Sequence, residues 1–96
     1  MTEYPMKTLT SHEKQELKGK AHKLKPIVII GNNGLTENVK IEIDRGLTDH
    51  ELIKIRINAA DRDERRALFE EICQGASADA IQLIGNIAII YRKNED

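Results

Sequence analysis

Apolar and polar residues repeat along this chain with two different periods, which predict three helices and four strands. Apolar residues spaced three and four positions apart share one face of a helix, whereas alternating apolar residues share one face of a strand. By these criteria residues 10–92 contain helix, strand, helix, strand, helix, strand and strand, in that order. The pattern therefore predicts an αβαβαββ domain.

The first predicted helix begins at Thr10, because Thr10 and Glu13 have the spacing of a capping box. Its apolar stripe consists of Leu17, Ala21 and Leu24. A basic stripe, at intervals of four residues, consists of Lys14, Lys18 and His22. At about 100° per residue, this basic stripe flanks the apolar one. Pro26 ends the region, because proline disfavours a helical backbone at the residue before it.

A β-α-β unit is expected next. Residues 26–30 form a β-branched run that ends at Gly31, which predicts a buried strand. After the loop, Thr36 can cap a second helix, whose inward stripe consists of Val39, Ile43 and Leu47. Residues 52–58 alternate, with isoleucines on one side and three polar residues on the other: Lys54, Arg56 and Asn58.

The last third of the chain predicts a helix and a hairpin. Asp61 and Glu64 mark the helix start, and its apolar face consists of Leu68, Phe69, Ile72 and Cys73. The turn Gly85-Asn86 joins two antiparallel strands, 80–84 and 87–92. Helical crossovers imply parallel, right-handed β-α-β units, so we expect an α/β (α+β) fold with a mixed four-stranded sheet. The polar side of residues 52–58 places the helices mainly on the opposite side of the sheet.

The length of 96 residues fits one domain, expected at 10–96 after a flexible lead at 1–9. Cys73 is the single cysteine, which excludes an intramolecular disulfide, and its apolar helix face favours a buried, inert thiol. The sequence has no apolar run that fits a signal peptide or a membrane span. We therefore expect a cytoplasmic protein that does not enter membranes and is a monomer.

Charge is distributed unevenly along the chain. Residues 1–25 carry six lysines and three glutamates, a net charge of +3, whereas residues 61–96 carry five basic and eight acidic residues, a net charge of −3. A polyanion would be attracted to one end of the molecule rather than to its whole surface. Ordinary scatter of charges is the alternative interpretation.

The segment Gly31-Asn32-Asn33-Gly34 lies between a predicted strand and a predicted helix N-terminus. Glycines allow a tight turn and close approach of a ligand, and the amides that open the helix have no internal partner. Such a site binds phosphate, because the positive end of the helix dipole lies behind it. The alternative is a turn in which glycine and asparagine only supply unusual backbone angles.

Other chemistry is not supported by the sequence. It lacks the GxGxxG of dinucleotide sites and the Lys-Ser/Thr of a P-loop. The three histidines are too dispersed to predict a metal site: His12, His22 and His50. We therefore expect no cofactor, metal, small-molecule substrate or catalysis, and a nucleic-acid backbone remains as the ligand of a GxxG loop.

These residues resemble the CRM domain (chloroplast RNA splicing and ribosome maturation), in its free-standing bacterial YhbY form. The most specific match runs from Lys18 to Thr36, and further matches occur at residues 50–55 and 84–92. The resemblance implies a fold similar to the C-terminal domain of translation initiation factor three. It also implies association with the RNA of the assembling large ribosomal subunit. Family loops often place a lysine or arginine where this chain has Asn32, so backbone amides would contribute more here.

A set of residues is accordingly expected to contact RNA: Lys14, Lys18, His22, Lys25, Gly31, Asn32, Asn33, Gly34, Thr36, Lys54, Arg56 and Arg92. Of these, Lys54, Arg56 and Arg92 are the weaker candidates. The sequence has no paired aromatic platform for bases, which favours backbone recognition with weak sequence readout. A different class of function stays open, in which the domain reaches the ribosome by binding a ribosomal protein.

Overall fold

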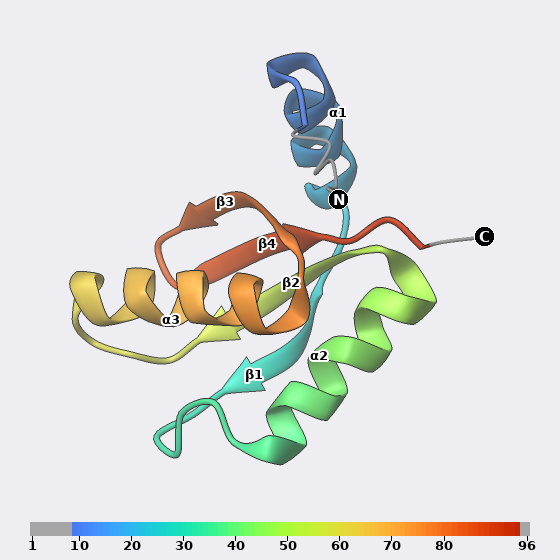
Figure 1. Ribbon diagram of the computed structural model, residues 1–96. Helices are drawn as coiled ribbons and strands as arrows, with labels where there is room; N and C mark the ends of the chain where they lie inside the picture. Colours follow the sequence, from blue (N-terminus) through green and yellow to red (C-terminus); the bar gives the residue numbers. More distant parts are fainter. Residues whose placement is uncertain (1–8, 95–96) are drawn as a thin grey trace, which may run out of the picture.

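The computed structural model describes residues 9–94 and contains the predicted seven elements in the predicted order. The helices are α1 (Ser11–Ala21), α2 (Glu37–His50) and α3 (Arg62–Ala76), and the strands are β1 (Pro26–Ile30), β2 (Leu52–Ile57), β3 (Asp79–Ile84) and β4 (Ile87–Tyr91). Figure 1 shows their arrangement. The expected flexible lead, apart from residue 9, lies outside the described residues. None of the described helices is long and apolar enough to cross a bilayer.

The four strands form one mixed sheet in the order β1-β2-β4-β3. Strands β1 and β2 are parallel and joined by α2, while β4 is antiparallel to both of its neighbours, β2 and β3. Each outer strand carries an irregularity in its register, between Pro26 and Val28 in β1 and between Ala80 and Gln82 in β3. The mixed sheet and its closing hairpin confirm the predicted fold class.

All three helix starts follow the predicted capping residues. The Glu13 amide donates to the Thr10 hydroxyl at 3.1 Å, and the Thr10 amide donates to the Glu13 carboxylate at 2.9 Å. The Asp61 carboxylate accepts from the Glu64 amide at 3.2 Å. Side-chain oxygens thus satisfy amides that the helix itself leaves unpaired, an effect that is typically about 1 kcal/mol per cap.

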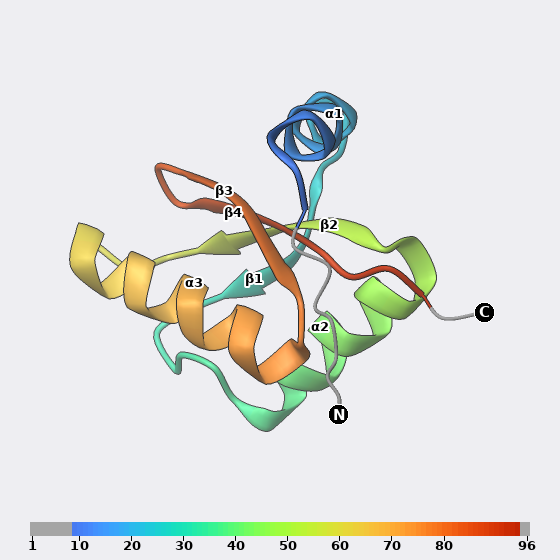
Figure 2. The same ribbon diagram turned by 45° about the horizontal axis from the view of Figure 1, so that its top comes forward.

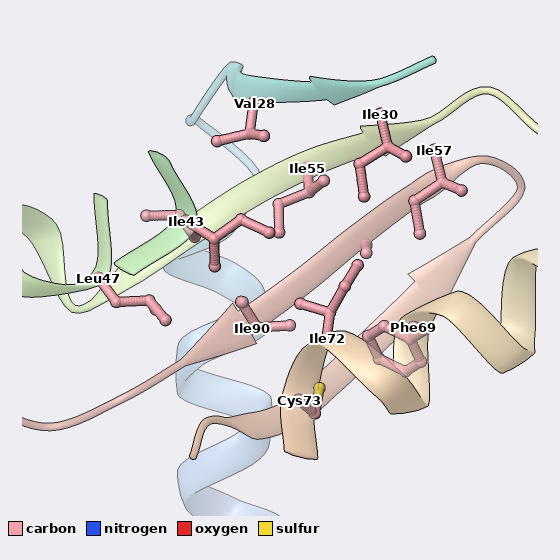
Figure 3. Close-up of a cluster of buried hydrophobic side chains, with 12 residues drawn as sticks. Val28, Ile30, Ile43, Leu47, Ile55, Ile57, Phe69, Ile72, Cys73 and Ile90 are labelled. Atoms are coloured by element: carbon pink, nitrogen blue, oxygen red, sulfur yellow. The ribbon is translucent and has the colours of Figure 1, made fainter. Parts of the chain in front are cut away.

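The main core lies between the sheet and the pair α2 and α3 (Figure 3). Its strand residues include Val28, Ile30, Ile53, Ile55, Ile57, Ala88 and Ile90, and its helix residues are Ile43, Leu47, Phe69, Ile72 and Cys73. The predicted inward stripes of both helices are therefore confirmed, with Val39 and Leu68 packed at the margin. This face of the sheet carries most of the buried apolar surface, which is the main source of folding free energy.

Of the helices in residues 9–94, only α1 covers the opposite face of the sheet, as Figure 2 shows. There a smaller cluster is buried, formed by Leu17, Ala21, Leu52, Ile81 and Ile89. We expected the helices mainly on one side, and α1 is the exception, because Leu17 and Ala21 need an apolar surface of their own. With 11 residues, α1 covers only one end of this face.

Strand β1 is only half buried, which corrects the predicted buried strand. Val28 and Ile30 are in the core, but Ile27 and Ile29 are 50% and 59% exposed. Strand β1 is at the edge of the sheet, and α1 does not extend over Ile29. A β-branched run alone does not distinguish a strand covered on both faces from an edge strand covered on one.

Candidate nucleic-acid interface

The segment Gly31–Gly34, the GNNG loop, forms a tight turn at the end of β1. The Gly34 amide donates to the Gly31 carbonyl at 3.0 Å, and the Thr36 amide donates to the Gly34 carbonyl at 3.0 Å. Gly34 has φ +71°, a conformation that glycine adopts without steric cost. A Cβ atom added at Gly31 would meet no atom within 4 Å. The loop therefore projects its tip, Asn32 and Asn33, into open solvent.

Several amides of this region are available to a ligand. Thr36 caps α2 by accepting from the Val39 amide at 3.2 Å, so internal capping is partial. Within residues 9–94, no acceptor is present for the amides of Asn32, Asn33, Leu35, Glu37 and Asn38. These donors lie at the positive end of the α2 dipole, the arrangement that binds phosphate oxygens.

Lys40 adds a cation to the loop region that the sequence did not reveal as a site residue. Its ammonium lies 3.7 Å from the Glu37 carboxylate, and both side chains are more than half exposed. The pair offsets the negative charge of Glu37 in the first turn of α2. Lys40 lies one helical turn after Thr36 and therefore on the same side of α2 as the cap. This placement depends on where α2 starts, which the structure shows.

The basic helix and the loop are not adjacent. Helix α1 precedes β1 and the GNNG loop follows it, so they lie at opposite ends of the strand in both views (Figures 1 and 2). The five residues of β1 alone span roughly 16 Å. Lys14, Lys18 and Lys25, which the sequence places in one expected RNA-binding set with the loop, therefore do not lie beside it. Connection along the chain does not imply proximity when a strand separates two elements.

The two flanks of α1 face different parts of the sheet. Lys20 lines a cavity with Leu52, Glu51 and Tyr91, and Glu13 is close enough to Tyr91 to raise its pKa, after the larger effects of burial, Glu51 and Asp79. At about 100° per residue, Lys18 and His22 lie on the other flank. That flank faces the part of the sheet that α1 leaves uncovered.

Lys14 and Lys18 are partly buried beside the apolar stripe, whereas His22 and Lys25 are exposed beyond the last turn of α1. Burial raises the pKa of Asp79, the first residue of β3, and the positive charge of Lys14 offsets part of that increase. Lys14 thus lies near the first residue of β3, over the covered end of the sheet. The basic stripe is positioned by the contacts of Leu17 and Ala21.

The part of this sheet face that no described helix covers, which we call the open face, is crossed by one row of paired residues. The row runs through all four strands as Ile29, Arg56, Ile87 and Ile84. The next row toward α1 contributes Lys54 and Gln82, on either side of the buried Ile89. Both predicted basic residues of β2 therefore lie on the same side of the sheet as α1.

Arg92, a predicted RNA-binding residue, has a structural role in the fold. Its guanidinium donates to the Asp44 carboxylate at 2.9 Å, to the Thr48 hydroxyl at 3.1 Å, and to the carbonyls of Asp44 and Ala76 at 3.1 and 3.0 Å. The side chain is 22% exposed. Arg92 thus joins the end of β4 to α2 and α3 through both of its terminal nitrogens. The sequence gives no signal for this network, which links residues far apart in the chain.

Cys73 is buried in the main core, which confirms the predicted buried thiol. Burial, with smaller contributions from Asp79 and Glu70, raises the pKa of this thiol to about 11. Because the thiolate is the reactive form, Cys73 is a poor nucleophile at neutral pH.

The fold and the loop define a class of small α/β domains. In this class a loop bounded by glycines joins an edge strand to a helix that packs on one face of the sheet. A family model for the CRS1 / YhbY (CRM) domain matches residues 9–92. This chain belongs to that family, as its resemblance at the sequence level implied.

Relatives with curated names support this assignment. The protein named "Probable RNA-binding protein PA4753", from Pseudomonas aeruginosa, is 49% identical over 86 residues, covering 90% of this chain and 83% of that protein. A protein of Haemophilus influenzae named "RNA-binding protein" is 44% identical over 91 residues, covering 95% and 92%. The solution structure of SAV1595 from Staphylococcus aureus has a TM-score of 0.82 and 32% identity over 93% of each chain.

Proposed function

We propose that this protein binds structured RNA through the GNNG loop and, separately, through α1. The main support is the set of backbone amides at the α2 N-terminus that have no acceptor within residues 9–94. These amides offer a phosphate site even though the GNNG loop contains no lysine or arginine. Lys14, Lys18 and Lys25 supply attraction at the other end of β1. Because the two sites are separated, one RNA must extend along the domain to reach both. The relatives named as RNA-binding proteins support this partner.

The RNA we propose is ribosomal RNA of the assembling large subunit, bound in the cytoplasm by a monomer with no catalytic step. This part rests on the resemblance to the CRM domain, whose name refers to ribosome maturation. Crosslinking the protein to RNA in cells and sequencing the attached fragments tests it. Fragments drawn mainly from messenger RNA would contradict the ribosomal assignment.

The contribution of α1 is tested by the variant Lys14→Glu with Lys18→Glu. We expect affinity for a structured ribosomal RNA fragment to fall several-fold or more, because phosphate contacts dominate such binding. A matched control is Arg62→Glu with Arg66→Glu, which makes the same charge change at the same spacing on the exposed side of α3. Equal losses in both variants would indicate only a general effect of net charge.

The contribution of the GNNG loop is tested by Gly31→Ala. The added Cβ meets nothing within 4 Å and Gly31 does not need a positive φ, so the fold should be unchanged. If an RNA backbone approaches this glycine closely, the methyl group should weaken binding several-fold. Gly75→Ala in α3, where the Cβ is equally free, is the control. Unchanged affinity in Gly31→Ala would remove the loop from the interface.

A protein partner is the second candidate function, favoured by the exterior of α2 and α3. Ile41 is 55% exposed on α2, and a groove of about 420 Å³ between the two helices is lined by Leu35, Ile43 and Ile72 among others. Treating the ribosome-associated protein with RNase distinguishes the two functions. Association through a ribosomal protein should survive this treatment, whereas association through RNA should not.

A further inference from the structure

We infer that the open face binds unpaired nucleotides next to the structured RNA, with isoleucines against the bases and Arg56 and Lys54 at the phosphates. This inference rests on the proposed RNA binding and adds a second class of contact to it. The open face lies on the side of the sheet that carries α1, between α1 and the strand ends where the GNNG loop begins (Figures 1 and 2). An RNA that reaches both ends of β1 passes beside this face.

The composition of the open face differs from that of an ordinary solvated strand surface. Ile29 and Ile84 are 59% and 55% exposed at the two outer strands, and Arg56 lies in the same row between them. The open face as defined contains two cations, one amide and three isoleucines, and no acidic residue. Exposed apolar side chains beside cations that have no ion pair within residues 9–94 indicate a ligand that presents both apolar surface and negative charge.

Unpaired nucleotides have these properties, whereas an RNA duplex does not. In a duplex the base faces are stacked inside, and the surface offers phosphates, hydroxyls and base edges. Isoleucines would find little apolar surface on such a partner. In an unpaired segment the base faces are exposed and alternate with phosphates. Four strands span roughly 14 Å, which is room for two or three nucleotides on a four-stranded sheet.

Flanking elements support the same ligand. Helical geometry places Lys18 on the flank of α1 opposite Lys20, which is the side nearer the open face, and Lys54 and Arg56 add positive charge on β2. Leu17, Ala21 and Ile89 are buried beneath α1. The helix therefore closes the apolar surface on one side and leaves the row of Ile29, Arg56 and Ile84 accessible.

The experiment compares two RNA probes, a blunt hairpin and the same hairpin with a short unpaired adenylate extension. We expect the extension to increase the affinity of the unmodified protein by roughly five- to ten-fold. The variant Ile29→Ser with Ile84→Ser should lose this gain and keep hairpin binding. Ile41→Ser is the matched control, because Ile41 is as exposed as Ile84 but lies on α2.

Salt dependence separates the two kinds of contact on the open face. Removing isoleucines should lower affinity for the extended probe without changing the slope of log affinity against log salt, because no counterion release is lost. Arg56→Gln should lower that slope by about one. Ile84→Tyr, which puts an aromatic ring in the same place, should increase affinity for the extended probe only.

Distinct outcomes overturn the inference or its basis. If the hairpin binds but the extension adds nothing, or Ile41→Ser loses the gain as well, the open face is not an RNA site and the proposed function stands. If neither probe binds, both fail. If sedimentation shows self-association that the Ile29→Ser and Ile84→Ser variant abolishes, the face serves a second copy of the chain and the inference is wrong.

Discussion

Ile29 and Ile30 are consecutive residues of one strand, yet the first is 59% exposed and the second 1% exposed. Ile30 points to the face covered by α2 and α3, and Ile29 to the face covered in part by α1. The helices on the two sides also differ in charge. Helices α2 and α3 together carry eight acidic and five basic residues, whereas residues 11–25, which include α1, carry two acidic and five basic residues. One face therefore supplies most of the buried core, whereas the other keeps exposed isoleucines and lies beside the basic residues of α1.

The largest effect expected from this comparison is on stability. Ile30→Ala should lower the free energy of unfolding by about 2–5 kcal/mol, because it removes buried methyl groups and leaves a cavity. Ile29→Ala should change it by less than about 0.5 kcal/mol, as is usual for exposed sites. Urea unfolding monitored by circular dichroism measures both. Similar losses in the two variants would mean that a ligand-free chain buries both faces.

Arg92→Ala tests the assignment of this residue to the structure and not to the binding face. We expect a loss of about 1–3 kcal/mol in unfolding free energy, because hydrogen bonds to Asp44, Thr48 and Ala76 disappear together. Arg92→Lys should recover little, since an ammonium lacks the planar fork. RNA affinity, measured where both proteins are folded, should stay unchanged. A selective loss of RNA affinity would restore Arg92 to the interface.

A smaller effect is expected in α1, the least anchored helix. Only Leu17 and Ala21 of its residues are buried, so its amides should exchange with deuterium faster than those of α2 and α3. Gly19→Ala adds a methyl group that meets nothing within 4 Å, and should stabilise the helix by roughly 0.5–1 kcal/mol. Slower exchange confined to α1 would agree with this. Uniform protection of all three helices would contradict the proposed difference between the faces.

The smallest effect concerns Cys73, whose reactivity reports whether the core between the sheet and α2 and α3 stays closed. With its pKa raised to about 11 by burial, almost no thiolate is present at neutral pH. Alkylation by iodoacetamide should be negligible in the native protein and complete after unfolding in urea. The native rate should follow unfolding of the core, so Ile30→Ala should increase it. Rapid labelling of the unmodified protein would show that this side of the core is open.

Local signals predicted the elements well because each was specified by neighbouring residues. The caps at Thr10, Thr36 and Asp61 and the turn at Gly85 need only a few positions of sequence. What could not be predicted depends on tertiary packing. The run of isoleucines in β1 does not say which face of the strand is covered. No short-range pattern shows that α1 and the GNNG loop lie at opposite ends of β1. The partners of Arg92 are likewise set by how β4 meets α2 and α3.

The register irregularities of β1 and β3 have a consequence for the protein in solution. Both are outer strands, so each could in principle template the addition of a strand from another molecule. A bulge interrupts the ladder of unpaired donors and acceptors and increases the local twist. Neither border of the sheet then offers a flat, regular edge, and aggregation by sheet extension is disfavoured even though isoleucines stand exposed on both strands.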